Sequence, residues 1–168
     1  MAPAPLRPSA ALAFALGLAA LVILLDQITK WLILGVVMVP PRTIEVTGFF
    51  NLVLVFNTGV SFGLFGGEAA WKPYAFGLLA LAVSGGLLVW LWRNPQRLPA
   101  FAVGLIIGGA LGNVIDRLRF AAVVDFLDFH LAGWHWPAFN LADAAITLGV
   151  ALLVVDGLFL EGRRGKKA

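Results

Sequence analysis

The stretch from Gly108 to Asp143 carries the residues most able to do chemistry. It holds Asp116, Asp125, Asp128 and Asp143, four of the nine acidic residues in the 168-residue chain. They lie at the ends of long apolar runs, where an ionised carboxylate is costly and therefore usually functional. Two carboxylates that share a proton can activate a water for the hydrolysis of a peptide bond.

Neighbouring bases narrow the choice of the two carboxylates. A lysine or arginine lies within four positions of Asp26, Asp116, Glu45 and Glu68. No base lies so close to Asp125, Asp128, Asp143 or Asp156. Because Asp156 is expected at the far end of the last helix, the predicted pair is Asp143 with either Asp125 or Asp128. Spacing alone does not choose between these two.

The composition is that of an integral membrane protein. The chain is 61% hydrophobic and only 12% charged, whereas soluble domains are about 45–50% apolar and about 25% charged. The absence of cysteine excludes disulfides, thiol nucleophiles and thiolate metal sites. The net charge is +3, but the bases form no stripe, so no nucleic-acid partner is expected.

Four apolar stretches predict four transmembrane helices, at about residues 10–34, 71–92, 100–118 and 140–160. The segment 40–70 is too polar and broken to span a bilayer. Its part Thr43–Phe56 predicts short strands, with an interfacial helix near the end of the segment. The segment 121–137 is expected to be an outer loop. The predicted fold is a single domain over 1–168, an all-α polytopic membrane protein with a small extracytoplasmic β-platform.

The basic residues predict the orientation. Four spans place both termini on one side of the membrane. Seven of the twelve bases lie at the two ends or in the loop between the second and third spans; they are Arg7, Arg93, Arg97, Arg163, Arg164, Lys166 and Lys167. By the positive-inside rule that side is cytoplasmic.

Three acids are predicted to meet at one depth. At about 1.5 Å per residue, Asp26, Asp116 and Asp143 each lie roughly 26–27 Å above the cytoplasmic ends of their helices. The hydrocarbon core is about 30 Å thick. The three carboxylates therefore converge just below the outer surface, with Asp125 above them. In addition, Gly104, Gly108 and Gly112 form a face that lets another helix approach closely.

Two of these acids admit structural explanations. Asp26 and Lys30, at i and i+4, form either an internal ion pair or a site for substrate backbone or a lipid head group. Asn140 and Asp143 could instead cap the fourth helix.

Asn113, Asp116 and Arg117 could form a local polar network that closes the third helix. For Asp116 this structural explanation is favoured, because the adjacent Arg117 stabilises the ionised carboxylate.

The sequence gives little support to other classes of protein. His130 and His135 lie five positions apart in a stretch with Gly133 and Pro137, without a zinc-binding phrase, so no metal is expected. Ser84 has no histidine or lysine at its depth, which argues against a serine protease. A proton-coupled transporter should show internal repeats or a midplane site. A scaffold without chemistry would not need two carboxylates free of neighbouring bases.

Five phrases, taken in order, resemble the lipoprotein signal peptidase (signal peptidase II) family of bacteria. The phrases are Asp26-Gln27-Ile28-Thr29-Lys30, Asn57-Thr58-Gly59-Val60-Ser61-Phe62, Gly112-Asn113-Val114-Ile115-Asp116-Arg117, Val123-Val124-Asp125-Phe126 and Phe139-Asn140-Leu141-Ala142-Asp143. The resemblance runs from about Leu25 to Gly149. It implies four helices, an outer β-platform and an aspartate dyad.

The resemblance also implies roles for individual residues. The catalytic pair would be Asp125 and Asp143. Binding or supporting roles fall to Asp26, Lys30, Asn57, Gly59, Asn113, Arg117 and Asn140, and Asp116 is expected to orient these neighbours. The implied substrate is a prolipoprotein whose cysteine carries diacylglycerol, cleaved just before that cysteine in the bacterial cytoplasmic membrane. The expected partners are this substrate and membrane lipid, and no cofactor is expected.

Overall fold

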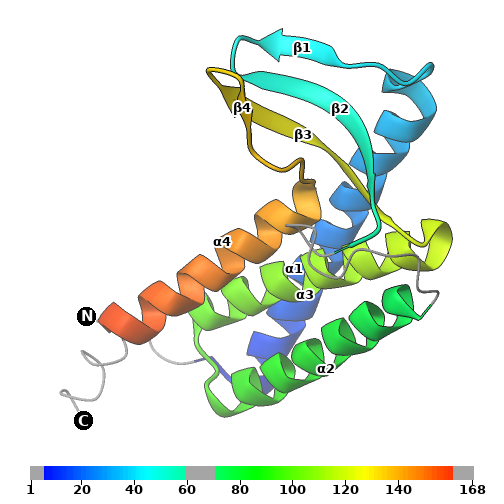
Figure 1. The fold of residues 1–168 in the computed structure, drawn as a ribbon. Helices are drawn as coiled ribbons and strands as arrows, with labels where there is room; N and C mark the ends of the chain where they lie inside the picture. Colours follow the sequence, from blue (N-terminus) through cyan, green and yellow to red (C-terminus); the bar gives the residue numbers. More distant parts are fainter. Residues whose placement is uncertain (1–5, 60–70, 161–168) are drawn as a thin grey trace.

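The computed structural model describes residues 6–59 and 71–160. Its elements are, in order, α1 (Pro8–Leu32), the π-helical turn η1 (Ile33–Val37), β1 (Ile44–Thr47), β2 (Phe50–Asn57), α2 (Lys72–Arg93), α3 (Arg97–Phe120), β3 (Val123–Leu131), β4 (Trp134–His135), α4 (Leu141–Val155) and the π-helical turn η2 (Asp156–Leu160). Four helices form a bundle, and the strands form one layer at one end of it (Figure 1).

Four helices in the described part of the chain are long and apolar enough to cross a membrane. They comprise Pro8–Val37, Tyr74–Arg93, Arg97–Phe120 and Leu141–Phe159. These ranges lie close to the four predicted spans. The interfacial helix predicted near the end of segment 40–70 and the basic tail at 163–167 lie outside the described residues.

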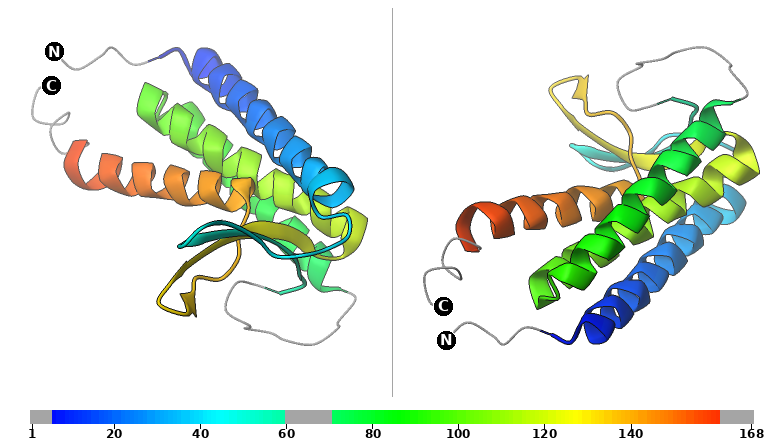
Figure 2. Two further views of the ribbon diagram at one scale, coloured as in Figure 1. Left: turned by 90° about the horizontal axis from the view of Figure 1, so that it is seen from above. Right: turned by 90° about the horizontal axis from the view of Figure 1, so that it is seen from below.

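Helix α3 is the centre of the bundle. In its most apolar 18-residue stretch 67% of the residues are buried, compared with 22% in the corresponding stretch of α1, 17% in that of α2 and 22% in that of α4. It packs against all three other helices and lies between α1 and α4 (Figure 2). Polar groups on α3 can therefore reach both α1 and α4, whereas those helices expose much of their surface.

Glycines on α3 bring both neighbouring helices into backbone contact. A Cβ at Gly108 would lie 2.8 Å from the carbonyl oxygen of Ala19 and 2.6 Å from Cβ of Val22, both on α1. A Cβ at the adjacent Gly109 would collide with the carbonyl oxygen of Ala142 on α4. The prediction of a close approach at the glycine face is confirmed, and the closeness extends to a second helix.

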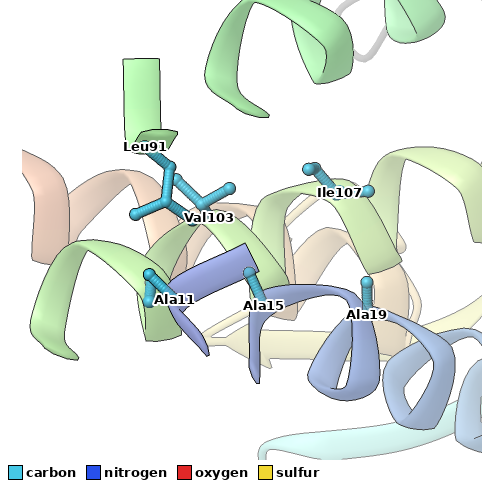
Figure 3. Close-up of a cluster of buried hydrophobic side chains, with 7 residues drawn as sticks. Ala11, Ala15, Ala19, Leu91, Val103 and Ile107 are labelled. Carbon is cyan, nitrogen blue, oxygen red and sulfur yellow. The ribbon is translucent and has the colours of Figure 1, made fainter. Parts of the chain in front are cut away.

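The half of the bundle away from the sheet has an apolar core. Figure 3 shows small side chains of α1 facing larger ones from α2 and α3, and the labelled residues are Ala11, Ala15, Ala19, Leu91, Val103 and Ile107. The alanines of α1 let this helix lie close to α3. The buried polar residues of α1 and α3 lie nearer the other end, beneath the sheet; they are Asp26, Lys30, Asn113 and Asp116.

The sheet is antiparallel, with strand order β1-β2-β3-β4. Strands β1 and β2 confirm the prediction for Thr43–Phe56, but the expected loop at 121–137 is wrong. That segment forms β3 and β4, because β3 finds a full-length partner in β2, far away in sequence. The label all-α is too narrow, since the chain combines four apolar helices with a small antiparallel sheet.

The two aspartates of β3 lie on opposite faces of the sheet. Ala121 ends α3 with a left-handed conformation, φ 55° and ψ 13°, and β3 begins two residues later. Successive side chains of a strand point to opposite faces. Asp125 and Asp128, three positions apart on β3, therefore point to opposite faces of the sheet.

Candidate active site

A buried lysine joins α1 to α3 at the sheet end of the bundle. The ammonium Nζ of Lys30 lies 2.8 Å from Oδ2 of Asp26, 2.7 Å from Oδ2 of Asp116 and 3.0 Å from Oδ1 of Asn113. These three acceptors match the three N–H donors of the lysine. Only 2% of Lys30 is exposed, so the predicted ion pair with Asp26 exists as part of a larger, enclosed network.

Gln27 is a member of this network that its sequence position did not reveal. Its Nε2 donates to Oδ1 of Asp116 at 2.9 Å, and lies 3.2 Å from Oδ2 of Asp26 and 3.3 Å from the carbonyl oxygen of Gly112. A residue next to Asp26 does not share a helix face with it in the way that residues three or four apart do. The close packing of α1 on Gly112 brings the amide into reach.

The two carboxylates around Lys30 also hold backbone amides of the elements that follow. The amide of Ala142, in the first turn of α4, donates to Oδ1 of Asp26 at 3.1 Å. The amide of Val124 on β3 donates to Oδ2 of Asp116 at 3.1 Å. A helix start leaves such amides without partners, so Asp26 anchors α4. Likewise, Asp116 anchors the residue that precedes Asp125.

Two asparagines carry the network on to the pair Asp125 and Asp143. Nδ2 of Asn113 donates to Oδ1 of Asp143 at 2.8 Å, while its Oδ1 accepts from Lys30 and from Asn140. Nδ2 of Asn140 donates to Oδ1 of Asp125 at 2.7 Å. Asn113 is 6% exposed and Asn140 is fully buried, so both amides orient carboxylates from within the protein.

Asn140 and Asp143 also form the cap predicted for the fourth helix. Oδ1 of Asn140 accepts from the amide of Asp143 at 3.0 Å, and Oδ2 of Asp143 accepts from the amide of Asn140 at 3.2 Å. This reciprocal capping box fixes the first turn of α4. The capping explanation is therefore correct, and Oδ1 of the same Asp143 still faces Asn113.

Asp125 is held by amides on both sides. Besides the bond from Asn140, its Oδ2 accepts from Nδ2 of Asn57 at 3.0 Å, at the end of β2. Oδ1 of Asn57 in turn accepts from the amide of Gly59 at 3.1 Å. Burial raises the pKa of Asp125 to about 6, and the charge of Asp143 adds to the effect, against the two amide bonds that lower it. This carboxyl group is therefore disposed to retain a proton.

Asp128 lies in a different environment on the opposite face of β3. Nδ2 of Asn51 donates to its Oδ2 at 2.9 Å, and Nδ1 of His135 lies 2.9 Å from its Oδ1. Burial raises the pKa of Asp128, but the bonds from His135 and Asn51 and the nearby histidine charges outweigh it, so the net pKa lies below the usual value. The ring of His130 stacks on that of His135. This group ties β2, β3 and β4 together.

The remaining sequence predictions concern charge partners and metals. The ion pair of Asp116 is with Lys30, whereas Arg117 donates to the carbonyl oxygen of Asn113 at 3.4 Å and lies over the ring of Phe76. Among residues 6–59 and 71–160, no group of three or more His, Cys, Asp and Glu side chains is arranged to hold a metal ion.

The arrangement suits acid–base chemistry by two unlike carboxyl groups. Asp125 is 1% exposed, hydrogen-bonded on both oxygens and raised in pKa. Asp143 is half-buried and borders a groove of about 680 Å³ on the surface of α4. Two carboxyl groups in different surroundings can divide the roles of acid and base.

Comparison with known proteins identifies the family of the chain. The family described as Signal peptidase (SPase) II matches residues 18–159. The lipoprotein signal peptidase of Janthinobacterium sp. (strain Marseille) is 46% identical over 149 residues, covering 88% of this chain and 90% of that protein. That of Burkholderia vietnamiensis (strain G4 / LMG 22486) is 49% identical over 151 residues, covering 89% and 90%.

Solved structures share the fold. Two structures described as a bacterial membrane enzyme each align with a TM-score of 0.73. One is 30% identical and covers 86% of this chain and 87% of that chain, and the other is 31% identical and covers 87% and 93%. Because the family match extends over most of the chain, and includes every element around the buried network, this multi-pass membrane protein belongs to the signal peptidase II family of lipoprotein signal peptidases.

Proposed function

We propose that the chain is an aspartic endopeptidase that removes signal peptides from diacylglyceryl-modified bacterial prolipoproteins, cleaving just before the lipidated cysteine. The proposed catalytic pair is Asp125 and Asp143. The observation that carries the assignment is the double role of Asn140, which donates to Asp125 through its side chain and caps Asp143 through its backbone and side chain. One residue thereby fixes both carboxyl groups relative to each other.

The unlike surroundings of the two acids support a division of labour. Asp125, with its raised pKa, holds the shared proton, and Asp143, beside the groove, acts as base on a water. The water oxygen attacks the scissile carbonyl carbon while Asp143 takes a water proton and Asp125 donates its proton to the carbonyl oxygen. In the second step Asp143 gives its proton to the leaving amine, the C–N bond breaks, and Asp125 recovers a proton from the gem-diol.

The remaining network residues are assigned supporting roles. The three donors of Lys30 are all used inside the protein, and Asp26 is fully buried. This favours the interpretation of these two residues as an internal support over the alternative that they hold a substrate or a head group. Asp116, Asn113 and Asn140 belong to the same support, while Asn57 and Gly59 shape the site from the end of β2. Arg117 is assigned a supporting role through the backbone of Asn113.

The proposed location is the bacterial cytoplasmic membrane, with both termini cytoplasmic and the active site near the outer surface. Helix α1 begins and η2 ends at the end of the bundle opposite the sheet (Figure 1). Most bases lie on that side in the sequence. The sheet and the aspartate pair would then face outwards, where a lipid-anchored substrate presents its scissile bond close to the interface.

Reporter fusions test this orientation. Fusions after Arg97 and at Lys167 should be active only with a cytoplasmic reporter, and fusions near Glu45 and Gly133 only with a periplasmic one, because bases favour the cytoplasmic side. A periplasmic C-terminus would place the aspartate pair on the wrong side and contradict the proposal.

Single substitutions separate the three aspartates near the sheet. Asp125→Asn and Asp143→Asn should each slow single-turnover cleavage of a lipidated prolipoprotein by about 10²- to 10⁴-fold, the usual contribution of proton transfer by such groups. Asp128→Asn is the matched control on the same strand and should retain activity within a few-fold. Melting curves of all three variants control for folding. An inactive Asp128→Asn beside an active Asp125→Asn would refute the assigned pair.

The pH profile tests the state of Asp125. In the wild type kcat/KM should fall as the pH rises, because the proton held by Asp125 is lost on the alkaline side, with its pKa of about 6 in the free enzyme. The hydrogen bond from Asn57 lowers this pKa, so Asn57→Ala should move the alkaline limb to higher pH.

Asn51→Ala is the matched control for the pH experiment. Asn51 also lies on β2 but donates to Asp128, so its loss should leave the alkaline limb in place. A shift of equal size in both variants, or a shift of the Asn57→Ala profile to lower pH, would show that Asp125 does not set the limb.

A further inference from the structure

A groove runs along the surface of α4 and starts at Asp143, one of the two proposed catalytic residues. Its volume is about 680 Å³. One side is the segment Trp136–Phe139, which leads from β4 down to the first turn of α4 (Figure 1). The other side is α4 itself, through residues that include Asp143, Ala144, Thr147 and Ala151. We call this feature the α4 groove.

The α4 groove leads from a carboxylate into the apolar part of the span. Ala144, Thr147 and Ala151 are spaced three and four residues apart, so they form one stripe on the helix. From Asp143 to Ala151 the helix rises about 12 Å at 1.5 Å per residue. Two alanines in this stripe leave the surface of α4 hollow. An occupant that is apolar along most of its length and polar where it meets Asp143 matches this lining.

The lining of the α4 groove is mostly apolar. Its apolar side chains include those of Trp136, Pro137, Phe139, Ile146 and Leu148, and its polar side chains are those of Asp143 and Thr147. An extended acyl chain can lie along such a surface with its polar end near Asp143.

We propose that the α4 groove binds an acyl chain of the diacylglyceryl group on the substrate cysteine. This inference rests on the proposed function. The lipid is attached to the residue that follows the scissile bond, so its chains must leave the catalytic pair and turn into the bilayer. The α4 groove starts at Asp143 and takes that direction. The signal helix is attached on the other side of the scissile bond, so it leaves the site from a different point.

The test uses Ala151→Trp, which fills the deep end of the α4 groove without touching the catalytic pair. Ala151 is exposed, so the larger side chain meets no buried packing. With a dipalmitoyl prolipoprotein, kcat/KM should fall about tenfold, the effect of keeping about two methylenes out of an apolar site. With a dibutyryl prolipoprotein, whose chains end above Ala151, kcat/KM should stay within twofold of the wild type. Ala151→Leu should give a smaller change of the same kind.

Val150→Trp is the matched control. Val150 is 47% exposed on the same helix but does not line the α4 groove, so both substrates should be cleaved as by the wild type. Equal losses of Ala151→Trp on both substrates, or no loss on either, would overturn the proposal. So would a loss that follows the length of the signal peptide, because that result would place the signal helix in the groove.

The same assay separates the two proposals. A wild-type protein that cleaves neither lipidated substrate would refute the peptidase function itself. A wild-type protein that cleaves both, with an Ala151→Trp variant insensitive to chain length, would refute only the acyl-chain assignment.

Discussion

The structure depends on one buried cation held between two carboxylates from different helices. Lys30 lies between Asp26 on α1 and Asp116 on α3, and all three side chains are at most 3% exposed. Removing charges from water costs several kcal/mol per ion, which is recovered only when every hydrogen-bonding group is satisfied. Here Gln27 donates a further hydrogen bond to Asp116, and Asn113 accepts the third hydrogen bond of Lys30. Close packing on the glycines of α3 makes the arrangement possible, because it brings both α1 and α4 into contact with α3.

Hydrogen bonds connect the groups around this cation to the elements that carry the proposed catalytic pair. Asp26 and Asp116 each accept a backbone amide, from Ala142 and Val124, and so fix the starts of α4 and β3. Asn113 and Asn140 then bind the two aspartates proposed as catalytic. The charged residues of α1 and α3 therefore have a structural role, because they hold the starts of α4 and β3 in place. The groups that could exchange protons with a substrate lie one layer further out, between the bundle and the sheet.

The sequence predicted the spans, the ion pair of Asp26 with Lys30 and the convergence of three acids, because helical rise and hydropathy are local properties. It could not choose between Asp125 and Asp128 by spacing. That choice depends on β3 being a strand, since only then does an odd spacing place the two side chains on opposite faces. The strand forms through pairing with β2, far away in sequence. Gln27 was missed for a similar reason, because its contacts require the packing of α1 on Gly112.

The central claim is that the buried network positions the aspartate pair without touching the substrate. Asn113 is the direct test, because it is 6% exposed and joins Lys30 to Asp143. In Asn113→Leu the single-turnover rate at saturating substrate should fall about 10- to 100-fold, equal to about 1.4–2.7 kcal/mol of activation free energy. The Kd of the lipidated prolipoprotein, measured in an Asp143→Asn background, should stay within twofold. A weakened Kd with an unchanged rate would contradict the account and make Asn113 a substrate-binding residue.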